Sequence, residues 1–312
     1  MNIIITGGNG FLGSRLAERF ISKGHKVTCL DINSKSFEYR KNILKNAKFI
    51  KADITSKNSL DKVKISRNSV LLHCAGQPSA ALSFKNPEDD CNKNINGMIN
   101  IIKFAHKNSV KKIIFASTFN VYKENNSSPK LSENSLCQPK SLLSVSKFSA
   151  ENYLRVFSSH LNIKWNILRM FNVYGPGQDP KNVNLGMISI FLNMAKKEPR
   201  IKLKGSIKRF RDFIYIDDVV DAWYKLTIDK KNFNKIYNLG SGNKVTLKTL
   251  FNHIGEVLNK KISIQVEKGT PGDFLGCYAN INKIKKDLNF NPKVELKKGI
   301  SKFNSWLDAE TK

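Results

Sequence analysis

Acidic residues are scarce in this chain of 312 residues. Its 25 Asp and Glu stand against 53 Lys and Arg, so the formal net charge is +28 at pH 7. A charge of this sign can indicate a nucleic-acid partner, but such partners need basic residues gathered on one face. Here the lysines come in pairs spread along the sequence, such as Lys111-Lys112, Lys196-Lys197 and Lys285-Lys286. We therefore attribute the charge to a compositional bias and expect no nucleic-acid partner.

Cysteines and long apolar runs are scarce as well. The five cysteines are Cys29, Cys74, Cys91, Cys137 and Cys277. No pair of them has the spacing of metal ligands, so we expect free thiols and no metal. No apolar run is long enough to cross a bilayer, and we expect no signal peptide before the first strand. The sequence therefore predicts a cytoplasmic protein with no membrane partner.

What the sequence does contain is a glycine-rich turn near its start. The β-branched run 2–6 is too short for a helix and predicts a buried parallel strand. Gly7, Gly10 and Gly13 follow, and apolar residues at helical spacing begin at Phe11. Glycines between a strand and a helix let the backbone approach a pyrophosphate, which the free N–H groups of the helix N-terminus then bind. The turn predicts a dinucleotide site.

A carboxylate follows at the distance that such a site needs. The second predicted strand, 26–31, ends in Asp31, eighteen positions after Gly13. An acid about 20 residues beyond the glycines commonly holds the adenosine ribose hydroxyls, although a turn or cap role would also place an aspartate here. Because a carboxylate repels a 2′-phosphate, the pattern favours NAD over NADP.

Strand and helix patterns alternate through the first half of the chain. Strands are predicted over 2–6, 26–31, 47–53, 69–76, 111–117 and 164–170, and long helices over about 88–106 and 143–160. This alternation predicts an α/β protein with a doubly wound parallel (Rossmann) sheet, whose ligands lie at the carboxyl ends of the strands. The second half predicts a smaller mixed α/β C-terminal substrate domain, with helical patterns near 185–197, 217–228, 246–258, 281–288 and 296–307. We expect the NAD-binding domain in 1–171, with 213–239 returning to it, and the second domain in 172–212 and 240–312.

Further motifs follow in order. They are HCAGQ at 73–77, NING at 94–97, FASTFNVY at 115–122, SK at 146–147, LRMFNVYGPG at 168–177, RDFIYIDDV at 211–219, YNLGSG at 237–242 and PGD at 271–273. With the glycine turn, Asp31 and Asp53-Ile54, these motifs resemble those of the extended short-chain dehydrogenase/reductases that act on nucleotide sugars. That family comprises 4-epimerases, 4,6-dehydratases and dehydrogenases. The resemblance covers nearly the whole chain.

The resemblance implies NAD as the cofactor, a nucleotide sugar bound by the second domain as the substrate, and a homodimer built on helices 88–106 and 143–160. Thr118 would hydrogen-bond the reacting sugar oxygen, and Lys147 would hold the nicotinamide ribose. The implied cofactor-binding residues are Gly7, Gly10, Phe11, Leu12, Gly13, Asp31, Asn33, Asp53, Ile54, Ala75, Gly76, Gln77, Asn94, Ser117 and Lys147. The implied substrate-binding residues are Gln77, Thr118, Asn120, Asn172 and Arg211. Structural alternatives stay open: a strand-end cap for Thr118, a solvated lysine for Lys147, a turn former for Asn172 and a surface charge for Arg211.

The pattern breaks at the family's central acid/base. In the family a tyrosine stands four residues before the lysine, on the same helix face, where the ammonium lowers the pKa of the phenol. Four residues before Lys147 stands Leu143, which cannot accept a proton, and Ser144 is one position off that face. Tyr122 lies nearby in sequence, but we expect a structural role for it.

Three interpretations of the leucine follow. In the first, the protein is an oxidoreductase whose proton passes to water, to another side chain or to the substrate. In the second, it binds NAD and a nucleotide sugar but has lost turnover. In the third, it is a laboratory variant, for which phenylalanine would be the commoner replacement. Loss of a general base typically costs about 10²–10⁴-fold in rate, which slows a reaction without abolishing it. Because the rest of the site is retained, we favour the first interpretation.

The sequence also narrows the reaction. Dehydratases of the family carry an Asp-Glu pair directly after the position of Thr118, where this chain has Phe119-Asn120, so water elimination lacks its acid and base. We expect oxidation of a sugar hydroxyl at C4 by a dehydrogenase or a 4-epimerase. The residues do not separate these two, and a weak base tilts the prediction slightly towards a dehydrogenase. Thr270 stands where the family often has an arginine, which puts one phosphate contact in doubt.

Overall fold

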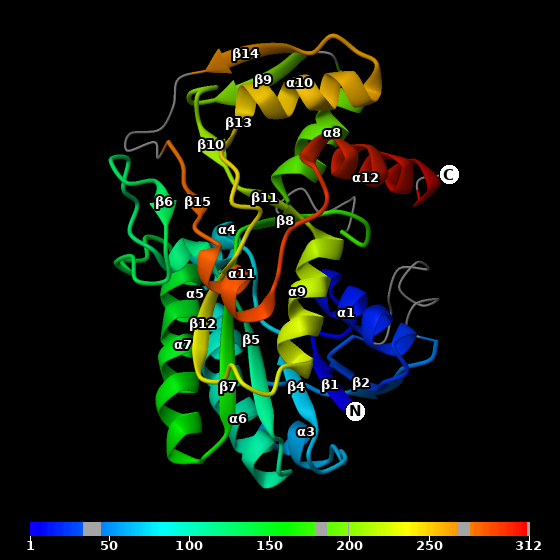
Figure 1. Cartoon of the computed structure of the whole chain (residues 1–312), viewed down its shortest axis with the longest axis vertical. Coiled ribbons are helices and arrows are strands. Elements are labelled where there is room, and N and C mark those ends of the chain that lie inside the picture. The colour runs from blue at the N-terminus through cyan, green and yellow to red at the C-terminus, as the bar shows by residue number, and fades with distance from the viewer. Residues whose placement is uncertain (34–44, 179–185, 199, 268–274, 311–312) are drawn as a thin grey trace. The chain divides into compact units, whose positions relative to one another are not determined.

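Two compact units make up the part of the chain that the computed structural model describes (Figure 1). The described residues are 1–33, 45–178, 186–198, 200–267 and 275–310. The first unit comprises 1–121, 137–170 and 220–237, and the second comprises 122–136, 171–219 and 238–312. Each unit therefore draws on three separate stretches of sequence.

A seven-stranded sheet forms the centre of the first unit, in the order β12-β7-β5-β4-β1-β2-β3. Its strands are β1 (Asn2–Thr6), β2 (Lys26–Asp31), β3 (Lys48–Lys51), β4 (Val70–His73), β5 (Lys112–Thr118), β7 (Lys164–Met170) and β12 (Lys235–Leu239). Neighbouring strands from β3 to β7 pair in parallel. The strand order reverses at β1, which is where a doubly wound sheet binds its ligand, beyond the carboxyl ends of the strands. The predicted Rossmann sheet is confirmed.

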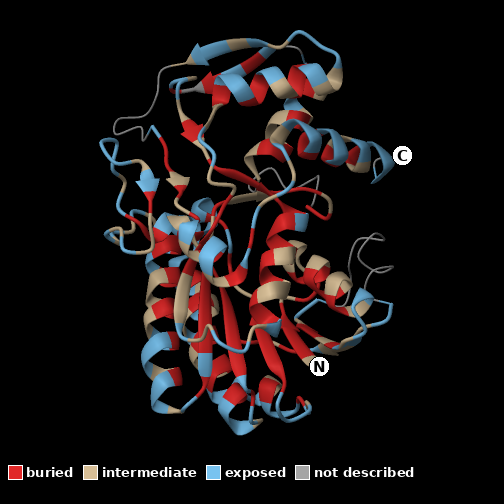
Figure 2. Cartoon of the chain, in the orientation of Figure 1, coloured by how far each residue is buried: buried red, intermediate tan, exposed pale blue. Residues whose placement is uncertain are grey.

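Helices cover both faces of this sheet (Figure 1). On one face α1 (Phe11–Ser22) is joined to α9 (Ile216–Ile228) by an ion pair between Arg19 and Asp221, whose nearest atoms are 2.8 Å apart. The other elements of the unit are α3 (Lys57–Asp61), α4 (Ala80–Lys85), α5 (Pro87–Cys91), η1 (Asn92–Asn96), α6 (Gly97–Lys107), η2 (Phe119–Val121) and α7 (Leu142–His160). Because both faces are covered, successive residues of the central strands β1, β4, β5 and β7 are nearly all buried, as Figure 2 shows.

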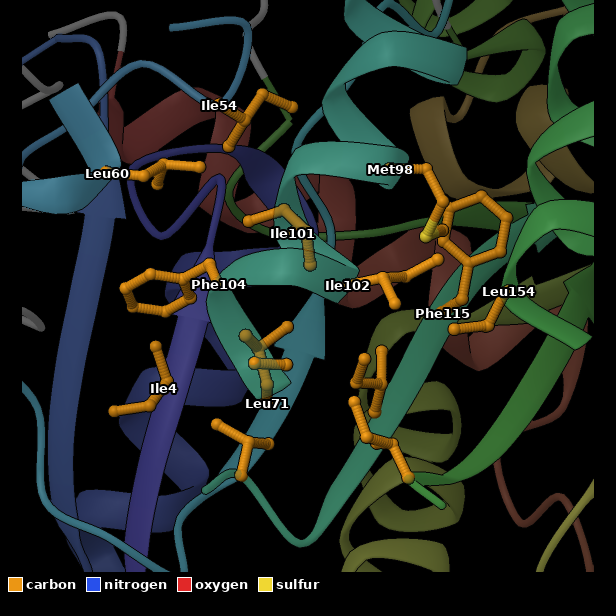
Figure 3. Close-up of a cluster of buried hydrophobic side chains, with 14 of the residues drawn as sticks. Ile4, Ile54, Leu60, Leu71, Met98, Ile101, Ile102, Phe104, Phe115 and Leu154 are labelled. Carbon is orange, nitrogen blue, oxygen red and sulfur yellow. The ribbon is translucent and has the colours of Figure 1, made fainter. Parts of the chain in front are cut away.

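A hydrophobic core lies on the face of the sheet covered by α6 (Figure 3). Ile4 and Leu71 supply it from the strands, and Ile101 and Phe104 supply it from α6, all at most 4% exposed. Burying a side chain of this size contributes about 1.5–3 kcal/mol of stabilisation. This packing holds the strand ends that carry the candidate site in fixed positions.

The helix predicted over 88–106 differs from a uniform α-helix. It consists of α5, the π-helical segment η1 and α6. Asn94 is buried in the π segment, where its side-chain amide donates to Asp90 and Ser146. Apolar periodicity could not reveal this, because residues 92–96 are mostly polar.

The second unit is a mixed α/β assembly of small sheets and helices. Its strand pairs are β10 (Phe210–Arg211) with β13 (Val245–Thr246), β11 (Phe213–Tyr215) with β8 (Asn172–Tyr174), β14 (Ser263–Glu267) with β9 (Arg200–Lys204), and β15 (Tyr278–Ala279) with β6 (Lys130–Leu131). Its helices are α8 (Met187–Lys197), α10 (Leu247–Leu258), α11 (Asn282–Leu288) and α12 (Leu296–Glu310). The first of these strand pairs is antiparallel and the others are parallel.

The unit boundaries differ from the expected domains at four places. Residues 122–136, 171, 213–219 and 238–239 lie with the second unit, although all were expected in the NAD-binding domain. Strand pairing accounts for the two longer stretches, since β6 pairs with β15 and β11 pairs with β8. Throughout the described residues, no helix combines the length and the apolar character that crossing a membrane requires.

Candidate functional site

The glycine turn between β1 and α1 leaves no room for side chains. Gly7 has a φ of +67°, and its N–H donates to the carbonyl of Leu30 at 2.9 Å. A Cβ on Gly13 would lie 2.1 Å from the carbonyl oxygen of Gly7, so the helix can approach the turn only with glycine here. Gly10 is the N-cap of α1 and provides no side-chain cap. The N–H groups of the first turn therefore point to a place where an anion can bind.

The carboxylate of Asp31 lies beside this turn. One of its oxygens accepts a hydrogen bond from the N–H of Asn9 at 2.9 Å, and the other accepts one from the N–H of Asn33 at 3.2 Å. The Asn9 amide in turn donates to the Asn33 carbonyl at 2.8 Å. A carboxylate has about four acceptor positions, so Asp31 can serve both as this structural cap and as a ligand for ribose hydroxyls.

Asp53 and Ile54 follow β3 and differ in exposure. The carboxylate of Asp53 accepts hydrogen bonds from the N–H and the hydroxyl of Thr55, both at 2.8 Å. Ile54 is only 7% exposed, and a Cβ on Gly97 would lie 2.8 Å from its Cδ1. Ile54 thus belongs mainly to the core, and its expected place beside the adenine stays a prediction.

A buried polar network stands at the carboxyl end of β4. The Asn94 amide donates to the Asp90 carboxylate and to the Ser146 hydroxyl, both at 3.0 Å. The Gln77 amide donates to Asp90 at 3.0 Å and to the Ser79 carbonyl at 2.8 Å. The network joins the segment after β4 to α5, η1 and α7. The side chains of Gln77 and Asn94 therefore hold this segment in place, and their expected contacts with the cofactor and the substrate stay predictions.

Lys147 reaches the same region from α7. The residue is 9% exposed, and its Nζ donates to the carbonyl of Ala116 at 3.3 Å and lies 4.9 Å from the centre of the Phe115 ring. A Cβ on Gly76 would come within 3.3 Å of Nζ, and Gly76 has a φ of +147°. Burial lowers the pKa of Lys147 to about 8. The negative charge of nearby groups such as Asp90 attracts the ammonium and opposes this lowering. Lys147 is thus not a solvated surface lysine.

Leu143 and Ser144 occupy the first turn of α7. Leu143 is 5% exposed, and its N–H donates to the Ser83 hydroxyl at 3.1 Å. Ser141 and Ser144 form a capping box, in which the Ser144 hydroxyl also donates to the Ser141 carbonyl at 2.9 Å. Ser144 is therefore committed to the helix N-terminus, one position off the face that carries Lys147.

Strand β5 ends in the residues expected to hold the reacting oxygen. The Thr118 hydroxyl accepts the N–H of Asn120 at 3.2 Å, so its own O–H stays free to donate to a ligand. Ser117 is buried instead, and its hydroxyl donates to Glu151 at 2.5 Å. The strand-end cap and the sugar-binding role of Thr118 are therefore compatible.

In the second unit, the side chains of Asn172 and Arg211 both donate to backbone carbonyls. The Asn172 amide donates to the Asp212 carbonyl at 2.9 Å, and the Arg211 guanidinium donates to the Phe210 carbonyl at 2.7 Å. The buried Asp212 carboxylate accepts three N–H groups, those of Ser241, Gly242 and Ala279, at 2.7–3.0 Å. Asp212 thereby fixes the backbone next to Asn172 and Arg211, the two residues of this unit that are expected to bind the substrate.

Other predicted residues are placed as follows. Tyr122 donates to the amide oxygen of Asn238 at 2.6 Å and is 3% exposed, which fits a structural role. Thr270 and the PGD motif at 271–273 lie outside the described residues. The five cysteines are free thiols, and in the described ranges no three His, Cys, Asp or Glu side chains gather as metal ligands do.

The model of the NAD dependent epimerase/dehydratase family matches residues 3–240 of this chain. A putative UDP-glucose 4-epimerase of Methanocaldococcus jannaschii is 33% identical over 306 residues, which are 98% of each chain. The crystal structure of a Thermotoga maritima UDP-glucose 4-epimerase with UDP-glucose superimposes with a TM-score of 0.91, at 30% identity and 100% coverage of both chains. A Thermus thermophilus UDP-glucose 4-epimerase in complex with NAD gives 0.88, at 28% identity and 99% coverage of both. The chain belongs to the NAD dependent epimerase/dehydratase family, which confirms the resemblance drawn from the sequence.

Sequence reasoning missed Asp90, which is 2% exposed and joins Gln77 to Asn94. Its position four residues before Asn94 puts the two on one helix face, so the spacing offered a signal. Asp90 also acts on Lys147, because its charge counteracts the loss of proton affinity that burial causes. The carboxylate is therefore part of the environment of the candidate site.

Proposed function

We propose that this protein is a UDP-sugar 4-epimerase of its NAD-dependent family and that it keeps its activity without the usual tyrosine. The observation that carries the proposal is Lys147. Its buried ammonium has one protein acceptor among the described residues and stands beside Gly76, at the carboxyl ends of β4 and β5. A buried charge that is left mostly unpaired is costly, so its retention indicates a ligand that pairs with it.

The residues of the first unit fit NAD. The first turn of α1 offers its N–H groups to a pyrophosphate, and Asp31 offers acceptors to the ribose hydroxyls. Lys147 would donate to the nicotinamide ribose and stabilise negative charge on the sugar oxygen, which the Thr118 hydroxyl would hold. When bound, NAD supplies the hydride acceptor for the sugar carbon.

For the substrate we propose that Arg211 and the second N–H of the Asn172 amide bind the diphosphate of the nucleotide sugar. A guanidinium matches phosphate oxygens in a bidentate geometry, and the anchoring by Asp212 would keep both groups in register. UDP is proposed because the named relatives act on or bind UDP-glucose.

The test is a titration with NAD and NADP followed by a panel of UDP-, GDP-, CDP- and dTDP-sugars, with products identified by mass spectrometry. We expect tighter binding of NAD, and interconversion of two UDP-sugars that differ at C4. A protein that binds neither dinucleotide would contradict the proposal.

Leu143 favours a second candidate function, a protein that binds NAD and a nucleotide sugar without turnover. This candidate predicts binding of both ligands, with no change in the nicotinamide absorbance for any sugar of the panel. A keto product released together with reduced cofactor would instead indicate the dehydrogenase that the sequence slightly favoured.

Leu143→Tyr is expected to raise the turnover rate by up to about 10²-fold, because it restores a phenol one turn before Lys147. The measurement is kcat with the sugar identified in the panel. Leu143→Phe is the matched control, since it adds the ring without the hydroxyl and should give no increase. An unchanged rate in the tyrosine variant would show that another group already carries the proton effectively.

We further propose a cytoplasmic homodimer. On α7 the apolar side chains of Val145, Tyr153 and Val156 are 45%, 46% and 74% exposed, and they recur at helical spacing. An apolar helix face of this kind is commonly covered by a partner. Analytical ultracentrifugation should give twice the chain mass, and Val156→Asp should shift it towards the monomer.

A further inference from the structure

We propose that Lys147 itself carries the proton that the family's tyrosine would carry. In this inference, which rests on the proposed function, Nζ takes the proton from the sugar hydroxyl when the carbon is oxidised and returns it when the carbon is reduced. Lys147 then acts as a catalytic acid/base and not only as a ribose ligand.

The first argument is the incomplete pairing of Nζ. An ammonium has three N–H groups, and within the described chain only the Ala116 carbonyl, at 3.3 Å, accepts one of them. The Phe115 ring lies below at 4.9 Å and satisfies no further N–H by a conventional hydrogen bond. A Cβ on Gly76 would lie 3.3 Å from Nζ and 2.5 Å from Oδ1 of Asn94, and this amide oxygen accepts the N–H of Gln77. Two N–H positions are thus left for a ligand.

The second argument is the position of Nζ relative to Thr118. Ala116 and Thr118 are two residues apart on β5, which corresponds to about 6.6 Å along the strand. The four-carbon stem of a lysine is flexible, so an Nζ that rests on the Ala116 carbonyl can move a few ångströms towards an oxygen held by Thr118. Nζ is therefore placed at the strand end where the hydroxyl is expected.

The third argument is that the other titratable groups near Nζ are bonded to other residues or have a pKa poorly matched to proton transfer near neutral pH. The carboxylates facing Lys147 are Asp90, which accepts from Gln77 and Asn94, and Glu151, which pairs with Arg169. His73 is bound to the Thr6 hydroxyl at 2.7 Å, and burial lowers its pKa to about 3. Cys74 follows His73 at the end of β4, and burial raises the pKa of its thiol.

The proton affinity of Lys147 suits the task. Burial lowers its pKa to about 8, although the attraction of the Asp90 and Glu151 carboxylates opposes this lowering. At pH 7 roughly one molecule in ten then has a neutral amine, and both forms are available near neutrality. A general acid/base works best with a pKa close to the working pH.

The step balances without a further reactant. On oxidation the sugar O–H bond breaks and its proton binds the lone pair of Nζ, while the C–H bond breaks and its hydride reduces the NAD that the proposed function supplies. On the return step the hydride rejoins the carbon, from either face in an epimerase, and the Nζ–H bond breaks to restore the hydroxyl.

The decisive variant is Lys147→Arg. Arginine keeps the positive charge and the donors but does not give up a proton. We expect NAD to bind within a few-fold of the wild type, while turnover falls by about 10²–10⁴-fold. The double variant with Leu143→Tyr should recover much of the loss, because the phenol then carries the proton. Turnover within threefold of the wild type in Lys147→Arg would overturn the inference.

A second measurement needs no activity. Competitive acetylation of the protein without ligands, followed by mass spectrometry of the Lys147 peptide, gives the pH at which the amine becomes reactive, with the exposed Lys103 as the internal reference. We expect a midpoint near 8, and the rate of sugar oxidation should rise with pH through the same midpoint. An acetylation midpoint above about 10, the usual range of a lysine, would overturn the inference. Failure of the proposed function would appear separately, as no binding of NAD by the wild type.

Discussion

Gly13→Ala is expected to weaken NAD binding by about 5- to 150-fold. The added Cβ would lie 2.1 Å from the carbonyl oxygen of Gly7 and 2.9 Å from the Cα of Gly8, so the turn and α1 must move apart. Overpacking of this kind costs about 1–3 kcal/mol, and the displaced N–H groups lose their alignment towards the pyrophosphate. Isothermal titration with NAD measures the effect.

Gly24→Ala is the control for this variant. Gly24 has a φ of +75°, and an added Cβ would meet nothing within 4 Å, so the substitution strains the backbone without crowding its surroundings. It should lower the free energy of unfolding by about 1 kcal/mol and leave NAD binding unchanged. Equal affinities for NAD in Gly13→Ala and the wild type would contradict the assignment of the turn.

Glu151→Ala is expected to lower the free energy of unfolding by about 3–5 kcal/mol, because it leaves the Arg169 guanidinium buried without its counter-charge. The two side chains are 1% and 3% exposed, and their shortest contact is 2.6 Å. The Ser117 hydroxyl loses its acceptor as well. Urea unfolding followed by circular dichroism measures the loss.

Asp89→Ala provides the comparison, because its ion pair with Lys93 has a similar contact distance of 2.8 Å but its side chains are 37% and 38% exposed. Exposed pairs contribute only about 0.2–1 kcal/mol. If both variants lost the same stability, burial would not be the reason for the importance of Glu151.

The sequence predicted the features that depend on short stretches of chain. The strands, the glycine turn and the spacing to Asp31 follow from local apolar patterns and from backbone sterics, and β1, β2 and β7 have the predicted bounds. The break at Leu143 was readable because it rests on one spacing within one helix.

Features that depend on pairing between distant residues were not predictable in the same way. The side chains of Gln77 and Ser117 bond to Asp90 and Glu151, from elements 13 and 34 residues away. The partition of 122–136 into the second unit likewise follows from β6 pairing with β15, a contact across about 150 residues. No local periodicity carries such information.

The place of β12 at the edge of the large sheet has a consequence for biosynthesis. Strand β7 ends at Met170, but the strand that covers its outer side is not translated until residues 235–239. During that interval a nascent chain presents the open backbone donors and acceptors of β7, which can pair with another chain. A fragment that stops near residue 230 should therefore self-associate through β7, and a ribosome-bound chain of that length should need a chaperone.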